Sequence, residues 1–279
     1  CSKMALGGIL VLNKIKEFGL FLKEIYEKRG LLWSLSKNDF RSKFAGSFFG
    51  AVWQFVIPIV SMFVFWFVFT TFKSMPVDDI PFMAWFVPAY VPWMFFTDCL
   101  NGSVNSLYDY SYLVKKIKFR TSMLPMVKVV SSLMINLFFI AFAFVIMLCY
   151  QVHLTVYAFQ IIYYMIGMII FCTGLSWLLS SITVLFRDMG AFVNVITQIG
   201  FWLTPIFWVA GNMAPWIQTL VKFNPMYYIT QGFRNSLIYG VGFWQTPGQT
   251  LYFWIITAIV FVGGAVVFRK LRPHFADVL

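Results

Sequence analysis

The chain has 279 residues, of which 61% are hydrophobic and 11% charged, against about 45–50% and about 25% in soluble proteins. These few charges are too sparse to cover a soluble globule, and 34 Phe, 13 Tyr and 11 Trp exclude a disordered chain. The composition therefore predicts an all-α integral membrane protein, because a bilayer is the solvent that accommodates so much apolar surface.

Residues 1–43 are predicted to form a cytoplasmic segment that contains an amphipathic interface helix. Ile15, Phe18, Leu22 and Ile25 recur at i+3 or i+4 spacing, which places them on one helical face. We expect this helix to lie along the membrane with its apolar side in the headgroups. Two interpretations stay open, a passive anchor on anionic lipid and a docking surface for a partner protein.

Residues 44–279 are predicted to form a transmembrane domain of six helices. Residues 44–72 carry no charge, and as a helix they would be about 43 Å long, which exceeds the roughly 30 Å of a hydrocarbon core. Between Lys128 and Arg187 lie 58 residues without a formal charge, which is suitable for two crossings. The expected spans are 44–72, 90–108, 129–149, 156–182, 189–209 and 249–268.

The second span differs from the others in its prolines and its one acid. Its first half is punctuated by Pro81, Pro88 and Pro92, which predicts a broken or re-entrant start. Asp98 would cost about 2.5–3.5 kcal/mol near the bilayer centre, so it marks a candidate functional site, and with Asn101 and Asn105 it indicates a polar helix face. The alternative is that Asp98 lies near the interface or caps the helix after Pro92.

Two connecting segments stand out for their patterns. Residues 109–120 form a short basic loop with spaced apolar side chains. Its charges either only set the orientation of the chain in the membrane, or the loop is a short amphipathic helix that a soluble partner protein binds. Residues 211–248 contain two short amphipathic pieces, 214–223 and 226–239, which predict re-entrant helices at the outer end. Arg234 in this segment is either an interface anchor or a ligand for a phosphate group.

The basic residues decide the orientation. With both termini cytoplasmic, 18 of the 21 Lys and Arg residues lie inside, and only Lys73, Lys222 and Arg234 lie outside. The net charge of +11 is thus explained by topology, and a nucleic-acid partner is not expected.

The sequence lacks the motifs of several enzyme classes. It contains no GxxxxGK[ST], HExxH, GxSxG or GxGxxG, no CxxC pair and only two histidines. We therefore expect no catalytic residues, no metal site and no ATP bound by this chain through a P-loop.

Short motifs from about residue 36 to the C-terminus resemble, in their order and spacing, the membrane subunit of ABC exporters of O-antigen, capsule or teichoic acid. They include Asp39-Phe-Arg, Phe49-Gly50-Ala-Val-Trp53, Pro92-Trp93-x-Phe95-Phe96, Leu113-Val114-Lys115-Lys116-Ile117-x-Phe119, Leu124-Pro125, Arg187-Asp188, Thr204-Pro205-Ile206 and Asn224-Pro225. The chain departs from the family pattern at Arg120 and at Thr121-Ser122, where the family often has Pro and Arg-Glu.

The resemblance implies a homodimer in the bacterial cell membrane, with two separate ATP-binding subunits that bind ATP and Mg and a lipid-linked polysaccharide as the substrate. It implies that residues 109–120 couple to the ATPase, through Tyr112, Leu113, Lys115, Lys116, Ile117 and Phe119, with Arg187 and Asp188 beside them. Candidates for the substrate path are Trp53, Trp93, Phe95, Phe96, Asp98, Asn101, Asn105 and Arg234.

Three other functions remain as alternatives. One is a subunit of the same fold that exports a drug, a lipid or another small substrate. The second is a membrane enzyme for polyprenyl-phosphate sugars, although Asp78-Asp79 is the only acid pair. The third is a secondary transporter, which would need more intramembrane charges than Asp98.

Overall fold

The structure is a computed structural model, and it describes residues 27–43, 49–71, 80–114 and 121–278. Every element assigned in these ranges is a helix, which confirms the all-α prediction. The amphipathic helix predicted around residues 15–25 lies outside the described residues.

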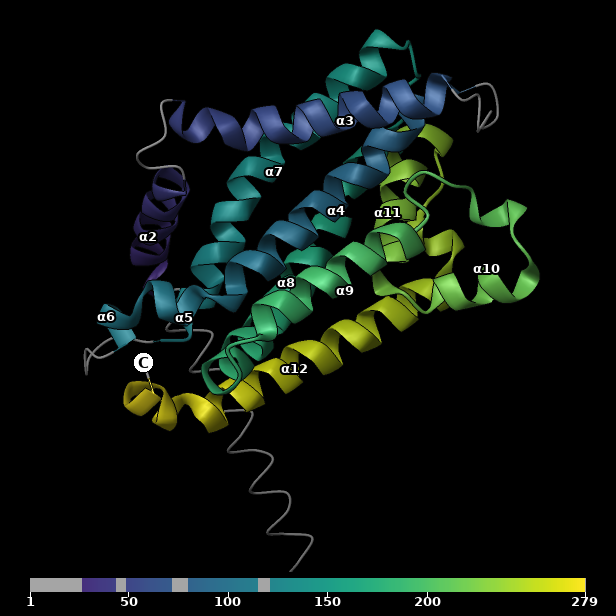
Figure 1. Ribbon diagram of the computed structural model, residues 1–279. Coiled ribbons are helices and arrows are strands. Elements are labelled where there is room, and N and C mark those ends of the chain that lie inside the picture. The colour runs from purple at the N-terminus through teal and green to yellow at the C-terminus, as the bar shows by residue number, and fades with distance from the viewer. Residues whose placement is uncertain (1–26, 44–48, 72–79, 115–120, 279) are drawn as a thin grey trace, which may run out of the picture.

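Long helices run back and forth between two ends of the molecule (Figure 1). They are α3 (Trp53–Thr71), α4 (Phe82–Val104), α7 (Met123–Cys149), α8 (Gln160–Leu185), α9 (Met189–Leu203) and α12 (Pro247–Val278). Four of them, α3, α7, α8 and α12, are long and apolar enough to cross a membrane. These four helices are candidate spans, and the six-span topology stays a prediction, with α4, which carries polar residues, and the shorter α9 as the other two expected crossings.

Helix α4 corrects the expected second span. It begins at Phe82 instead of residue 90 and continues as one α-helix through Pro88 and Pro92, so the prediction of a broken start was wrong. Each proline removes one backbone hydrogen bond. However, α4 packs against α3, α7, α8, α9 and α11 and is buried along most of its length, and such packing stabilises a helix more than local preference does.

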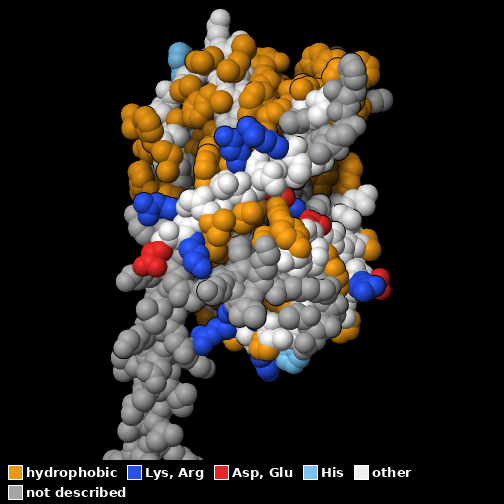
Figure 2. Space-filling model, turned by 90° about the vertical axis from the view of Figure 1, so that its left-hand side faces the viewer, with side chains coloured by type: hydrophobic (Ala, Val, Ile, Leu, Met, Phe, Trp, Pro, Cys, Tyr) orange, Lys and Arg blue, Asp and Glu red, His pale blue; other side chains and the backbone are white. Residues whose placement is uncertain are grey.

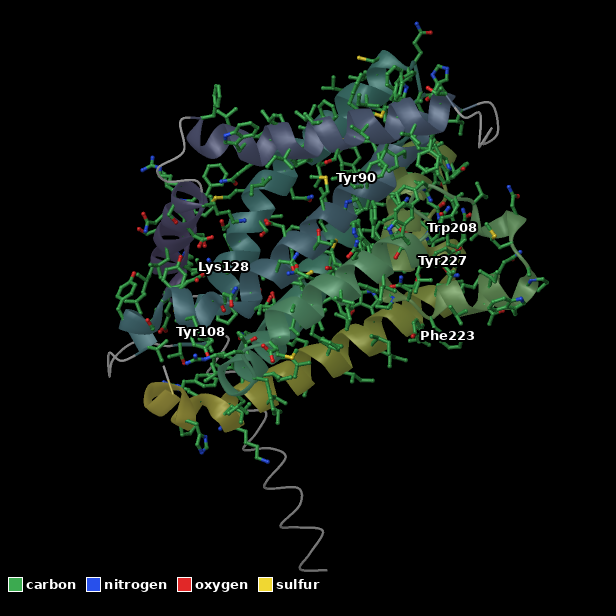
Figure 3. All side chains as sticks on the ribbon, viewed as in Figure 1. Tyr90, Tyr108, Lys128, Trp208, Phe223 and Tyr227 are labelled. Atoms are coloured by element: carbon green, nitrogen blue, oxygen red, sulfur yellow. The ribbon has the colours of Figure 1, made fainter. Side chains whose placement is uncertain are left out.

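Aromatic side chains fill the core around α4. The rings of Phe69 and Phe207 stack with their centroids 5.6 Å apart, and Phe82 stacks on Phe86 at 5.3 Å. Tyr90 continues this row at 5.0 Å from Phe86, and Figure 3 shows it on the side of α4 that is next to α3. Many of the aromatic residues therefore act as packing groups that fix α3, α4 and the chain after α9 against one another.

Helices α8 and α12 pack closely through two glycines. A Cβ atom on Gly174 would lie 2.6 Å from the Cα atom of Phe261, and one on Gly264 would overlap the carbonyl oxygen of Gly174. Small residues at such positions let two apolar helices approach until their backbones touch. The glycines thus set the distance between these two helices.

The two ends of the bundle carry different short helices. At one end lie α2 (Arg29–Ser42), α5 (Ser106–Asp109), α6 (Ser111–Val114) and the last turns of α12, and we call it the α2 end (Figure 1). Towards the opposite end lie α10 (Pro215–Lys222) and α11 (Pro225–Arg234), followed by a π-helical turn at Asn235–Tyr239. The predicted pieces 214–223 and 226–239 thus correspond closely to helices.

The remaining short elements are 3-10 turns. They are η1 (Gly50–Val52), η2 (Val156–Phe159), η3 (Ala210–Asn212) and η5 (Phe243–Gln245).

Candidate functional site

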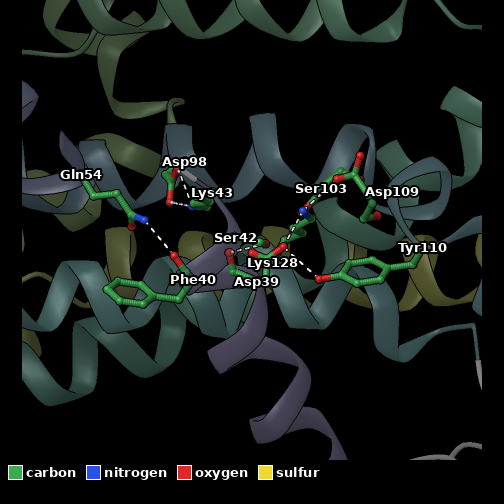
Figure 4. A network of polar contacts seen from close by, with 11 residues as sticks. Asp39, Phe40, Ser42, Lys43, Gln54, Asp98, Ser103, Asp109, Tyr110 and Lys128 are labelled. Atoms are coloured by element: carbon green, nitrogen blue, oxygen red, sulfur yellow. Dashed lines mark hydrogen bonds and ion pairs between the residues drawn. The ribbon is translucent and has the colours of Figure 1, made fainter. Parts of the chain in front are cut away.

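A buried ion cluster joins α2 to the rest of the α2 end. The Lys128 ammonium lies 2.7 Å from Asp39 Oδ1 and 2.8 Å from Asp109 Oδ2, and the Tyr110 hydroxyl donates to Asp39 Oδ1 at 3.0 Å (Figure 4). Asp39 belongs to α2, Lys128 to α7 and Asp109 to α5. We call these four residues the Asp39 cluster, and it connects three separate segments of the chain.

The surroundings of Tyr110 in the Asp39 cluster determine its protonation state. Asp39 and Lys128 are buried, so each charge needs its partner. Burial and the neighbouring carboxylate of Asp39 raise the pKa of Tyr110 well above its ordinary value. Tyr110 therefore stays protonated at physiological pH and keeps donating its hydrogen to Asp39. Sequence analysis noted Asp39 and Lys128 but did not pair them, because 89 residues separate them along the chain.

A second ion pair lies between α2 and α4. Lys43 Nζ is 2.9 Å and 3.2 Å from the two carboxylate oxygens of Asp98, and the side chains are 20% and 42% exposed. Asp98 thus has a partner from the segment that precedes the first predicted span. Asp98 is therefore not an isolated charge, because its carboxylate has a cationic partner.

Beside this ion pair is a pocket of about 430 Å³ between α3, α4 and α7. Its walls include three of the substrate-path candidates, Trp53, Phe95 and Asp98, together with Gln54 and Asn136. A smaller pocket of about 330 Å³ is lined by two other candidates, Trp93 and Phe96, together with residues of α9, α10 and α11. The predicted path residues therefore gather in two separate places, and Asn101 and Asn105 are exposed on α4 and its C-cap without lining either of these pockets.

Arg234 has a structural role that corrects its prediction as a substrate contact. It is 1% exposed, and its guanidinium donates to the carbonyl oxygens of Trp85 at 3.1 Å, Pro205 at 2.6 Å and Ile206 at 2.6 Å. The group also stacks on the Trp85 ring at 3.4 Å. Arg234 thus ties α11 to α4 and to the segment after α9, and it is not available for a phosphate.

The predicted coupling residues lie at the α2 end where the structure describes them. Tyr112 is 57% exposed on α6, Leu113 is half-buried beside it, and Arg187 and Asp188 are exposed at the turn between α8 and α9. The other predicted members lie outside the described residues: Lys115, Lys116, Ile117 and Phe119. Figure 2 faces this end and shows Lys and Arg side chains distributed around it.

Metal chemistry finds no support in the part of the chain that the structure covers. Over those ranges, no group of three or more His, Cys, Asp or Glu side chains is placed to hold a metal ion.

The four long apolar helices indicate a membrane protein. The sequence model of the family described as ABC-2 type transporter matches residues 30–238. The chain therefore belongs to the ABC-2 type transporter family and is a multi-pass membrane subunit of a transporter.

Curated relatives add a more specific likeness. The chain is 27% identical over 187 residues to the O-antigen export system permease protein RfbA of Myxococcus xanthus, covering 67% of this chain and 71% of that protein. It is 23% identical over 250 residues to a protein of the same name from Klebsiella pneumoniae, covering 89% of this chain and 95% of that protein. The resemblance found from short motifs is thus confirmed.

Proposed function

We propose that this chain is the membrane subunit of an ABC exporter that moves a lipid-linked polysaccharide, of the O-antigen class, across the bacterial cell membrane. The observation that carries the proposal is the likeness to O-antigen export permeases over 89% of this chain. Family membership implies an ATP-binding partner, which would bind ATP and Mg, while this chain supplies the path through the membrane.

The geometry of the α2 end supports this division of labour. A partner ATPase needs a surface outside the bilayer, and Tyr112, Arg187 and Asp188 are exposed together at that end with the basic residues of Figure 2. The proposal includes a second copy of the chain as the other wall of the path, since a polar polymer cannot cross hydrocarbon unassisted. We include in the proposal the six crossings, both termini inside, and the helices of residues 211–248 as the outer re-entrant segment.

Depletion of the protein in its own cells tests the proposal. We expect polysaccharide on its lipid carrier to accumulate on the cytoplasmic leaflet, while surface polysaccharide disappears. The control is the same strain complemented with the intact gene. Normal surface polysaccharide with no trapped intermediate would contradict the proposal and leave an ABC-2 exporter of a drug, a lipid or another small substrate.

A further inference from the structure

The outer face of α2 carries basic side chains at helical spacing. Trp33, Lys37 and Arg41 follow one another at intervals of four residues, which places them in one row along the helix. All three side chains are exposed, and Trp33 is 58% exposed. Among the described residues, neither Lys37 nor Arg41 has an ion-pair partner. We call these three residues the Trp33 row, and it presents two uncompensated positive charges beside an indole ring.

The opposite face of α2 holds the helix against the bundle. Asp39 on this face is buried and pairs with Lys128 of α7. Leu32 and Leu35 pack against the apolar cluster that includes Leu107. Because these contacts fix the rotation of α2 about its own axis, the Trp33 row stays on the outer side of the molecule.

Contacts with the first candidate span set the level of α2 relative to the membrane. The Gln54 side-chain nitrogen donates to the carbonyl oxygen of Phe40 at 3.0 Å, so the last turns of α2 lie beside the first turn of α3. Phe49 and Ile57 are 56% and 52% exposed there, and such apolar surface belongs in hydrocarbon. Figure 1 shows α2 running across the direction of α3, next to its start. A helix in this position lies at the level of the lipid headgroups.

We propose that the Trp33 row binds the phosphate groups of anionic phospholipids in the leaflet at the α2 end. Lys37 and Arg41 supply charge of the opposite sign, and each basic residue near a membrane surface strengthens the attraction about fivefold. Trp33 suits the same level, since tryptophan favours the boundary between lipid and water. The inference holds whichever substrate is exported, so it stands apart from the proposed function.

A partner ATPase is the other candidate for this face, and the fold places its expected contacts elsewhere. Tyr112 lies on α6, and Arg187 and Asp188 lie at the turn between α8 and α9. In Figure 1, α2 is on the α3 side of this end, whereas the turn between α8 and α9 is on the α12 side. The experiment below includes binding of the ATPase as an outcome.

Site-specific photocrosslinking in lipid nanodiscs tests the proposal with the purified transporter, including its ATP-binding partner. The photoreactive residue p-benzoylphenylalanine replaces Ser34, which is exposed and lies three and seven residues before Lys37 and Arg41, on the same side of α2. The nanodiscs contain equal amounts of phosphatidylglycerol and phosphatidylcholine with the same acyl chains. After irradiation, mass spectrometry identifies the molecules attached at position 34 and gives the ratio of the two lipids.

We expect phosphatidylglycerol to predominate among the adducts of the otherwise unchanged chain. Lys37→Gln and Arg41→Gln should each lower the ratio of phosphatidylglycerol to phosphatidylcholine about fivefold, and the double variant about 25-fold. Lys37→Arg keeps the charge and should keep the ratio. The matched control is the double variant Lys222→Gln with Lys270→Gln, which removes the same charge at exposed positions of α10 and α12 and should also leave the ratio unchanged.

Three results would overturn the proposal. Equal amounts of the two lipids in the adducts of the unchanged row would show that the row does not select an anion. A fall in the control variant as large as that in Lys37→Gln with Arg41→Gln would show that only the net charge of the chain matters. Adducts of the ATP-binding subunit in place of lipid would assign the Trp33 row to the protein partner.

Discussion

Two lysines of the α2 end make ion pairs in different surroundings. Lys128 is buried between Asp39 and Asp109, whereas Lys43 and Asp98 are partly exposed. Lys128→Met should therefore lower the free energy of unfolding by about 3–5 kcal/mol, because it leaves a buried carboxylate without its cation. Lys43→Met should lower it by about 1 kcal/mol or less, as for other exposed pairs. Thermal unfolding of the purified proteins in one detergent compares the two.

A double variant separates the effect of the unpaired charge on stability from the effect of the altered side-chain shape at the same site. Asp39→Asn added to Lys128→Met removes the buried charge that the single substitution leaves behind, so part of the lost stability should return. Equal melting temperatures for Lys128→Met and Lys43→Met would contradict the assignment of Lys128 as the centre of the Asp39 cluster.

Substitution of Arg234 tests whether the shape or the charge of its side chain stabilises the contact of α11 with α4. Lysine keeps the charge but has no planar fork to reach the carbonyls of Trp85, Pro205 and Ile206 together or to stack on the indole. Arg234→Lys should lower the free energy of unfolding by about 2–4 kcal/mol. Lys222→Ala, at an exposed position on α10, should leave the melting temperature unchanged. A stable Arg234→Lys protein that fails in export would instead return Arg234 to the substrate path.

At the scale of elements, α12 has two adjacent glycines, Gly263 and Gly264, and only Gly264 lies in the contact with α8. A Cβ on Gly264 would overlap the backbone of Gly174, whereas one on Gly263 would have nothing within 4 Å. Gly264→Ala should lower the free energy of unfolding by about 1–3 kcal/mol, since the helices must separate. Gly263→Ala should cause no loss, because alanine is the better helix former. Thermal unfolding of the two variants measures this difference. A similar loss of stability in both would show that the backbones of α8 and α12 do not touch at Gly264.

The sequence predicts elements better than it predicts their pairing. Charge-free stretches predict α3, α7, α8 and the start of α12, and the amphipathic pieces predict α10 and α11, although α12 continues to Val278, past the expected end at residue 268. The start of α4 was misjudged, because local proline preference is outweighed by packing on all sides. The Asp39–Lys128 pair and the role of Arg234 depend on contacts between distant segments, which no local pattern encodes.

At the scale of the whole molecule, the α2 end combines a buried ion cluster with an exposed surface. The Asp39 cluster holds α2, α5 and α7 together, and α6 follows directly after Asp109 and Tyr110. A push on α6 from a bound ATPase would therefore act on α7 and α2 at once, since they share one buried cation.

The last prediction concerns that surface. Tyr112 is 57% exposed, so Tyr112→Ala should leave the melting temperature of the isolated chain nearly unchanged. If the side chain is an anchor for the ATPase, its loss should weaken association about tenfold and lower surface polysaccharide accordingly. Tyr150→Ala is the control, because Tyr150 is a partly exposed tyrosine that caps the opposite end of α7. Co-purification of the ATPase and staining of surface polysaccharide measure both effects. Equal export in the two variants would remove Tyr112 from the coupling surface, whereas loss of export with normal association would place it in the transmission of movement instead.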